Sequence, residues 1–259
     1  MKIHVYGKSV VGNSRQHNED QIFCQGHYRM NLNELQDTYK GKGRICDLLL
    51  FAIFDGMGGL ANGEKASEMC SELIAEHLRE DISGKKQFNA VDSIMEMNRS
   101  IVENRHISKM GSTAVVAECR NKTLQITNIG DSRAYWLRDH NLIRLSVDHT
   151  LEERIKKISS EYNVILGDNE FQKHALTQYV GVPEDEFLIE PHISERITVH
   201  SGDQCLLCSD GLTDLVTEEQ IMDELSKDIN NEKKVDELIN NALKSDKTDN
   251  ISVILIRWE

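Results

Sequence analysis

Short apolar runs recur along most of this sequence, and they restrict its fold more than any other feature. Each run is four to nine residues long and is bounded by polar or turn-forming residues, which is typical of β-strands. The runs between residues 113 and 145 follow one another closely, so an antiparallel meander is expected there. The predicted strands are residues 46–54, 113–119, 124–129, 134–137, 142–145, 197–200, 205–208 and 251–256.

Amphipathic helices are predicted between and after these strands. Apolar residues recur on one helical face over residues 66–78 and again over residues 91–102, and both stripes fall between the first two predicted strands. Residues 221–225 and 235–243 predict two more helices near the C-terminus. Because strands and paired helices are segregated along the chain, the pattern favours an α+β fold of packed layers over strict β-α-β alternation.

The chain shows no sign of an internal domain boundary. Its 259 residues contain only two prolines, Pro183 and Pro191, and no Gly/Ser/Pro-rich linker. This length is within reach of one large domain, so a single domain over residues 1–259 is expected. Periodicity is weakest over residues 147–192, which we interpret as a short helix at 151–159 followed by a mobile flap.

Net charge restricts the partners that such a chain can bind. The formal net charge is −13, whereas nucleic acids and anionic membranes attract positively charged proteins, so neither is an expected partner. No apolar run approaches the ~20 residues that cross a bilayer, and the N-terminal residues lack the apolar core of a signal peptide. The six cysteines lie mostly in apolar segments, which favours reduced, buried thiols and a cytoplasmic location.

Acidic residues recur where predicted strands begin or end. Asp55 and Asp210 each follow an apolar run and precede a glycine, and Asp249 stands just before a run. One such carboxylate is an ordinary turn or helix cap. Several in the same context are better explained by convergence on cations, because ionised groups resist desolvation. Oxygen ligands without paired nitrogen or sulfur ligands point to magnesium or manganese. The segments read RQHNED (15–20), FDGMGG (54–59), NIGDSRAYW (128–136), LLCSDGLTD (206–214) and DNISVIL (249–255).

The glycines after Asp55 admit three interpretations: a tight corner, a phosphate-binding loop or a metal site. No lysine followed by serine or threonine comes after Gly56, Gly58 and Gly59, and their spacing does not match GxGxxG, so a phosphate loop is disfavoured. Glycine allows a sharp backbone turn and exposes a carbonyl oxygen as a further ligand. Together with the other acidic segments, this favours a metal site at Asp55 and Gly56.

Taken in order, these motifs resemble the metal-dependent serine/threonine protein phosphatases of type 2C, in their bacterial form. Each motif is short, but the ordered set is specific, and the resemblance extends from about residue 5 to residue 257. The matching motifs are Arg15 with Asn18, Glu19 and Asp20, DGMGG (55–59), GST (111–113), GDSRAY (130–135), DHT (148–150), LTQYVG (176–181), SDG (209–211) and DN (249–250).

The resemblance implies a fold and a metal centre. That family folds as a four-layer α-β-β-α sandwich, in which two stacked antiparallel sheets are flanked by pairs of helices and the metals lie at one end. Two manganese or magnesium ions are implied, with a third, weaker one. By the resemblance, Asp55 bridges the two ions and the Gly56 carbonyl completes one of them. Asp210 and Asp249 would hold the other.

The resemblance also assigns residues around the two ions. Glu19 and Asp20 would act through metal-bound waters, and Asp131 with Asp214 would form the third, weaker metal position. Arg15 would clamp the substrate phosphate, since a guanidinium forms forked, charge-assisted hydrogen bonds to phosphate oxygens.

The implied function is hydrolysis of phosphoserine and phosphothreonine in proteins. Two cations ~3.5–4 Å apart can lower the pKa of a bound water from about 15.7 to near neutrality. The resulting hydroxide would attack phosphorus in line while Arg15 and the cations stabilise the phosphoryl oxygens, so no phosphoenzyme is expected. The expected partners are phosphorylated proteins and a serine/threonine kinase that the enzyme opposes, and a monomer is expected.

Two positions depart from the family pattern. Met57 stands where many eukaryotic members have a histidine, which is taken as the acid that protonates the leaving group. Protonation must therefore come from another group, which the sequence does not identify. Gln178 stands where arginine or lysine is usual, which puts a substrate contact there in doubt.

Some of these residues have ordinary structural interpretations. Cys205 and Cys208 have zinc-like spacing, but there is no second pair and their thiols would face opposite sides of a strand, so core packing is expected. A structural role is also expected for His149. Asp214 has an equally good alternative, as a cap for a helix that begins near Thr217.

Two other functions are compatible with parts of the pattern. A non-catalytic phosphatase-like module would bind a partner or a phosphorylated segment, but inactive relatives generally lack one or more of the metal carboxylates, and all are present here. A two-metal nuclease would use similar ligands. Its substrate favours a basic surface, which the net charge of −13 disfavours.

Overall fold

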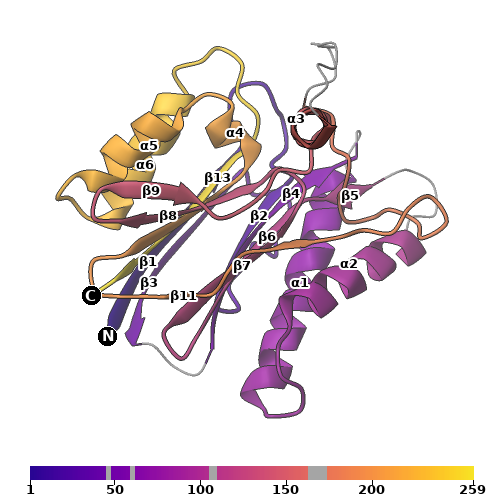
Figure 1. Cartoon of the computed structure of the whole chain (residues 1–259), viewed down its shortest axis with the longest axis horizontal. Helices are drawn as coiled ribbons and strands as arrows, with labels where there is room; N and C mark the ends of the chain where they lie inside the picture. Colours follow the sequence, from indigo (N-terminus) through magenta and orange to yellow (C-terminus); the bar gives the residue numbers. More distant parts are fainter. Residues whose placement is uncertain (45–47, 59–61, 105–109, 163–173) are drawn as a thin grey trace.

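Two antiparallel sheets, stacked face to face, form the centre of the computed structural model (Figure 1). The structure describes residues 1–44, 48–58, 62–104, 110–162 and 174–259. The first sheet contains, in spatial order, β3 (Gln36–Arg44), β1 (Lys2–Val10), β13 (Ile251–Trp258), β12 (Gln204–Cys208), β8 (Arg133–Arg138) and β9 (Asn141–Arg144). The second contains β10 (His192–Ile193), β7 (Thr123–Ile129), β6 (Ala114–Arg120), β4 (Leu49–Met57) and β2 (Asp20–Cys24), with β11 (Ile197–Thr198) paired to β7 and β5 (Gly111–Ser112) paired to β4.

Helices cover the outer face of each sheet. The first sheet is covered by α4 (Asp210–Thr213), α5 (Glu218–Ser226) and α6 (Asn231–Ala242), and the second by α1 (Gly63–Ile82) and α2 (Ala90–Asn104). The remaining helix of the described chain, α3 (Leu151–Tyr162), stands apart from both layers (Figure 1). The expected four-layer α-β-β-α sandwich is confirmed. None of the helices in the described ranges combines the length and hydrophobicity that crossing a bilayer requires.

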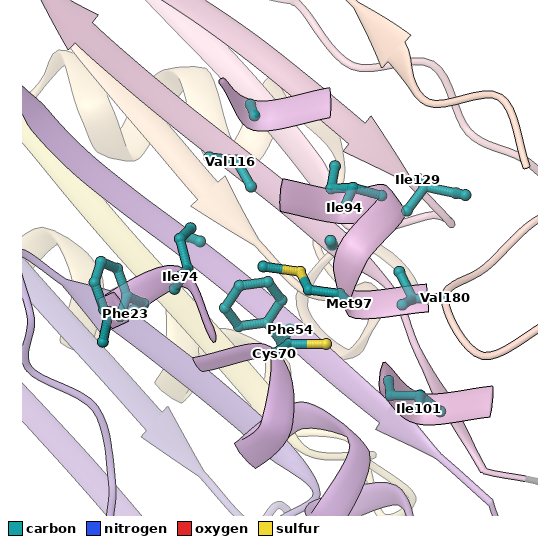
Figure 2. Close-up of a cluster of buried hydrophobic side chains, with 14 of the residues drawn as sticks. Phe23, Phe54, Cys70, Ile74, Ile94, Met97, Ile101, Val116, Ile129 and Val180 are labelled. Atoms are coloured by element: carbon teal, nitrogen blue, oxygen red, sulfur yellow. The ribbon is translucent and has the colours of Figure 1, made fainter. Parts of the chain in front are cut away.

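Three layers of buried apolar side chains hold the four layers together. Under α1 and α2, Phe54 of β4 packs among Cys70, Ile74 and Met97 (Figure 2). The second layer lies between the two sheets, and the third lies under α5 and α6. Both faces of β13 are apolar because each faces a buried layer. Ile254 belongs to the layer between the sheets, and its neighbours Val253 and Leu255 belong to the layer under the helices.

The helices follow the predicted stripes. The stripe at 66–78 lies in α1, whose Cys70, Ile74 and Leu78 are buried, and the stripe at 91–102 lies in α2. The predicted helix at 151–159 corresponds to α3. Cys205 and Cys208 are both buried and belong to different apolar layers, so their thiols face opposite sides of β12, as expected.

The strands match less completely. The run at 46–54 corresponds to β4, although residues 45–47, including the thiol of Cys46, lie outside the described residues. Strands β1, β2 and β3 were not predicted. Strand β3 reads QDTYKGKGR and lies at the edge of its sheet, where polar residues replace the apolar alternation that marks other strands.

Part of the expected flap is hydrogen-bonded to the body of the protein. The side chain of Asn98 in α2 accepts from the Gly181 and Val182 amides at 2.7 and 2.9 Å and donates to the Val182 carbonyl at 2.9 Å. The Val180 and Ser112 backbones exchange two hydrogen bonds of 2.9 Å. The flap prediction for residues 163–173, and Gly59 in the glycine-rich segment, lie outside the described residues.

Candidate functional site

The strand register brings two predicted acidic residues side by side. Asp20 is the first residue of β2 and pairs directly with Asp55, near the end of β4. Thr113 fixes the Asp55 backbone, because its hydroxyl accepts from the Asp55 amide at 3.2 Å and its amide donates to the Asp55 carbonyl at 2.9 Å. Two residues that are 35 positions apart in the sequence thus lie side by side at one end of the strands of the second sheet.

The first sheet contributes Asp210 and Asp249 from adjacent strands. Asp210 begins α4 directly after β12, and Asp249 lies just before β13, which pairs with β12. The Ser209 amide donates to the Ser252 carbonyl at 3.0 Å, which ties the two strand ends together. Both residues therefore lie at one end of their sheet.

Asp131 lies where the chain passes from one sheet to the other. It follows β7 of the second sheet and precedes β8 of the first. The neighbouring Ser132 hydroxyl is 2.7 Å from the hydroxyl of Thr113, the residue that fixes Asp55. His149 holds this turn as well, since its amide donates to the Gly130 carbonyl at 2.9 Å, which agrees with the structural role expected for it.

These carboxylates lie close enough together to repel one another. Burial, followed by the charge of Asp20 and then that of Asp210, raises the pKa of Asp55 well above its usual range. Burial also raises the pKa of Asp20 to about 7, of Asp131 to about 8 and of Asp210 to about 6, with neighbouring acids adding to each shift. Such a cluster of acids, of which Asp20 is buried and Asp55, Asp131 and Asp210 are half-buried, is stable in its ionised form only if positive charge joins it.

One buried oxygen of the cluster is without a partner. The Asp20 Oδ2 accepts a hydrogen bond of 2.9 Å from the Ser209 hydroxyl, whereas its Oδ1 is buried and has no hydrogen-bond partner in the structure. Buried polar atoms are normally satisfied, so an unpaired carboxylate oxygen among other acids suits a cation or its water shell.

Close packing of the backbone explains Gly56. A Cβ atom on this residue would lie 2.0 Å from the Gly63 carbonyl oxygen at the start of α1 and 2.6 Å from the Glu19 carbonyl oxygen. Both contacts are with backbone, which cannot move aside as a flexible side chain can. Glycine at this position therefore lets β4, α1 and the Glu19 segment meet beside Asp55.

The backbone of Glu19 is held from several directions. Its amide donates to the Asn250 Oδ1 at 2.8 Å, and its carbonyl accepts from the Gly56 amide at 3.2 Å and from the Ser67 hydroxyl at 2.6 Å. Asn250 is 4% exposed and also donates to the Val11 carbonyl at 2.8 Å. The DN motif (249–250) includes Asn250, but sequence reasoning did not assign it this role.

Arg15 lies against a predicted metal ligand. Its Nη2 is 2.5 Å from the Asp249 Oδ2, and both side chains are partly exposed. The predicted phosphate clamp is therefore within the acidic cluster, paired with one of its members.

Asp214 does not cap the helix that follows it. Thr217 is the N-cap of α5 and forms a capping box with Gln220, so the alternative role for Asp214 is wrong. Asp214 instead ends α4, and its amide donates to the Asp210 carbonyl at 2.8 Å. Its charge also raises the pKa of Asp131, after burial and the charges of Asp210 and Asp148.

The donor set suits hard cations that keep part of their water. Within the described residues, no group of three or more histidine, cysteine or acidic side chains is arranged to hold one ion by itself. Carboxylates, a backbone carbonyl and water are the oxygen ligands that magnesium and manganese accept. The cluster fits such ions if water and the Gly56 carbonyl complete the coordination.

Comparison with known proteins places the chain in a family. The family model described as protein phosphatase 2C matches residues 9–155 and 165–251. The chain belongs to the protein phosphatase 2C family. The expected resemblance is thereby confirmed, and with it the activity: the chain is a metal-dependent protein serine/threonine phosphatase.

Bacterial phosphatases are among its relatives. The chain is 30% identical over 212 residues to the serine/threonine phosphatase Stp of Listeria monocytogenes serotype 4b, which covers 79% of this phosphatase and 82% of the relative. It is also 30% identical over 211 residues to the serine/threonine protein phosphatase PstP of Mycobacterium tuberculosis, which covers 80% of this chain and 40% of that longer protein.

Solved structures share the fold. The crystal structure of Mycobacterium tuberculosis PstP matches 100% of both chains with a TM-score of 0.75 and 26% identity. A PstP catalytic domain in complex with two manganese ions matches 98% of both chains with a TM-score of 0.70 and 26% identity. The family and this neighbour support a dinuclear metal site in the phosphatase.

Proposed function

We propose that this phosphatase hydrolyses phosphoserine and phosphothreonine in proteins at the acidic cluster where both sheets end. The observation that carries the proposal is the proximity of carboxylates from distant segments, among them Asp20, Asp55 and Asp210, whose burial and mutual repulsion raise their pKa values. Perturbed acids gathered in one place are typical of functional sites.

The residues would divide the work as follows. Asp55, Asp210, Asp249 and the Gly56 carbonyl would hold two divalent ions, which when bound supply a water of near-neutral pKa and positive charge toward the phosphoryl oxygens. Arg15 would leave Asp249 and donate its forked hydrogen bonds to the substrate phosphate.

Supporting residues would surround this pair of ions. Glu19 and Asp20 would orient the waters of the centre, and the unpaired Asp20 Oδ1 supports that role. A third, weaker ion would lie between Asp131 and Asp214, and the charge of Asp214 raises the pKa of Asp131. We favour manganese for the main pair because the PstP neighbour holds two manganese ions.

The cellular role follows from the reaction. We propose a single-domain, cytoplasmic monomer that reverses the action of a serine/threonine kinase. The free, buried thiols of Cys24, Cys70, Cys205 and Cys208 support a reducing compartment. Comparing the phosphoproteomes of cells with and without the protein would identify the substrates, and a lack of any change in phosphoserine or phosphothreonine would contradict the proposed role.

The activity can be tested with synthetic phosphopeptides. We expect phosphate release from phosphoserine and phosphothreonine peptides with manganese, loss of release in excess EDTA, and recovery when manganese is restored. Turnover that EDTA leaves unchanged would contradict the metal requirement. Tight binding of manganese without turnover of any phosphopeptide would favour the non-catalytic module instead.

Replacing Arg15 with glutamine is expected to weaken substrate binding. A charge-assisted hydrogen bond contributes about 1.5–3 kcal/mol, so KM for a phosphothreonine peptide should rise about 10–100-fold at saturating manganese. Steady-state kinetics would measure the change. Arg99→Gln is the matched control, because Arg99 is an exposed α2 residue whose distance to its carboxylate partner Glu184 is 3.7 Å. A wild-type KM in Arg15→Gln would exclude the phosphate-clamp role.

A further inference from the structure

Arg29 is a buried cation that the sequence motifs do not include. It follows β2 and is 3% exposed. Its Nε is buried and has no hydrogen-bond partner among the described residues. Burying a guanidinium is unfavourable unless its donors are satisfied and its charge is balanced, so the arrangement around Arg29 calls for an explanation.

The guanidinium of Arg29 binds backbone on both sides of Glu19. Its Nη2 donates to the carbonyl of Asn18 at 2.6 Å and to the carbonyl of Asp20 at 3.0 Å. Its Nη1 donates to the Glu34 carbonyl at 2.9 Å. One nitrogen therefore fixes the residue before Glu19 and the residue after it.

Arg29 is itself held rigidly. The side chain of Gln21, which is fully buried, accepts from the Arg29 amide at 3.1 Å and donates to the Arg29 carbonyl at 2.9 Å. Gln21 belongs to β2, the strand that Asp20 begins. The position of Arg29 is thus tied to the strand that begins at Asp20.

The other contacts of this segment hold the amide and the carbonyl of Glu19 itself. Asn250 holds the Glu19 amide, and Gly56 and Ser67 hold its carbonyl. None of these contacts reaches the carbonyls of Asn18 or Asp20. Arg29 adds one hydrogen bond on each side of Glu19 to these contacts, and together they set the direction in which the Glu19 and Asp20 side chains leave the backbone.

The charge of Arg29 has the sign that the acidic cluster requires. Burial lowers the pKa of the Arg29 guanidinium, and the negative charges of Asp20, Asp37 and Glu64 oppose that shift. A cation behind Asp20 reduces the repulsion that this carboxylate experiences from the other acids.

We propose that Arg29 is a positioning residue for the metal centre, which fixes the Asn18–Asp20 backbone from behind so that Glu19 and Asp20 present their carboxylates to the bound ions. This inference rests on the proposed function, because it assigns Glu19 and Asp20 to the surroundings of the ions. It adds a cation from outside the motif set, one that touches neither substrate nor metal.

Manganese calorimetry on two variants tests the proposal. Arg29→Met removes fork and charge, and Arg29→Lys keeps the charge but loses the fork. Loss of a residue that orients metal-centre groups typically costs 10–100-fold, so we expect manganese affinity and kcat of Arg29→Met to fall by about that factor, with KM for a phosphothreonine peptide little changed. Arg29→Lys should show a smaller loss of both.

Arg120→Met provides the matched control. Arg120 lies at the far end of β6 from Thr113 and pairs with Asp81 at 2.7 Å, so its loss removes a partly buried arginine without touching the cluster. We expect a lower melting temperature with unchanged manganese affinity and kcat. Folding of every variant would be checked by circular dichroism, and Arg29→Lys carries the test if Arg29→Met does not fold.

A purely structural Arg29 predicts a different result. Folded Arg29 variants with a reduced melting temperature but wild-type manganese affinity and kcat, measured well below that temperature, would overturn the proposal. Calorimetry keeps this outcome separate from failure of the proposed function. A wild-type protein that binds manganese without turnover would refute the enzyme assignment, while the affinities of the Arg29 variants would still report on positioning.

Discussion

Replacing Asp55 with asparagine is expected to lower kcat/KM for manganese-dependent hydrolysis of a phosphothreonine peptide by at least about 10³-fold. The amide removes the charge that both ions of the proposed centre would share. The same change should raise the melting temperature of the metal-free protein, because Asp55 lies half-buried beside Asp20, Asp210 and Asp131 and an uncharged side chain relieves their repulsion. Peptide kinetics and thermal unfolding in EDTA would measure the two effects.

The opposite signs of these effects make the prediction specific. Asp203→Asn is the matched control: Asp203 is 2% exposed, pairs with Arg138 at 2.6 Å and lies at the other end of β12 from Asp210. We expect this variant to lose stability and keep its kcat/KM. Substantial turnover by Asp55→Asn would refute the role of Asp55, and a lower melting temperature in EDTA would refute the repulsive cluster.

The metal-free protein is expected to become less stable as pH rises from 5 to 8. The pKa values of Asp20, Asp131 and Asp210 are raised to about 7, about 8 and about 6, chiefly by burial, whereas an aspartate in the unfolded chain has a pKa of about 3.9. Between these values the folded state binds more protons than the unfolded state, so the free energy of unfolding decreases with pH. Urea unfolding in EDTA at four pH values would measure the slope.

Divalent ions should remove this loss of stability. Cations favour the ionised carboxylates, so binding strengthens as pH rises at a fixed manganese concentration. A concentration that is 100 times the dissociation constant at pH 8 adds about 2.7 kcal/mol to the free energy of unfolding there, and it adds less at lower pH. The difference between the curves with manganese and with EDTA should therefore widen from pH 5 to pH 8. Parallel curves would contradict the assignment of the acidic cluster as the metal site, because titrating groups elsewhere affect both curves equally.

Much of the fold could be predicted from local pattern. The stripes that became α1 and α2 and the run that became β4 are strongly periodic or continuously apolar, so burial selects one structure for each. Strand β3 carries no such pattern, because an edge strand exposes much of its length and its pairing with β1 depends on backbone hydrogen bonds. Strand β2 has only five residues and begins at Asp20, the last residue of the acidic RQHNED segment, which we interpreted as part of a metal site and not as a strand.

The residues of the candidate site also differ in whether the local sequence pattern could identify them. Asp55, Asp210 and Asp249 could be identified from sequence because each interrupts or borders an apolar run where a lone charge is unfavourable. Asn98 and Arg29 could not, and the DN motif (249–250) contained Asn250 without assigning it a role. Each acts through hydrogen bonds to backbone groups that are distant in sequence or in a neighbouring loop, and nothing in the local pattern of a polar residue records which carbonyl it will meet.

The sequence by itself determined the layer architecture, the positions of the acids relative to their strands and, through the ordered motifs, the family. Only the tertiary structure decided that Asp20 pairs with Asp55 and that Arg15 contacts Asp249. It also decided that Arg29 binds the backbone of the Asn18–Asp20 segment. The physical reason is the distance along the sequence over which each effect acts. Burial of apolar side chains acts on each segment through its own periodicity, whereas strand register and sheet stacking depend on the whole chain and set which charges become neighbours.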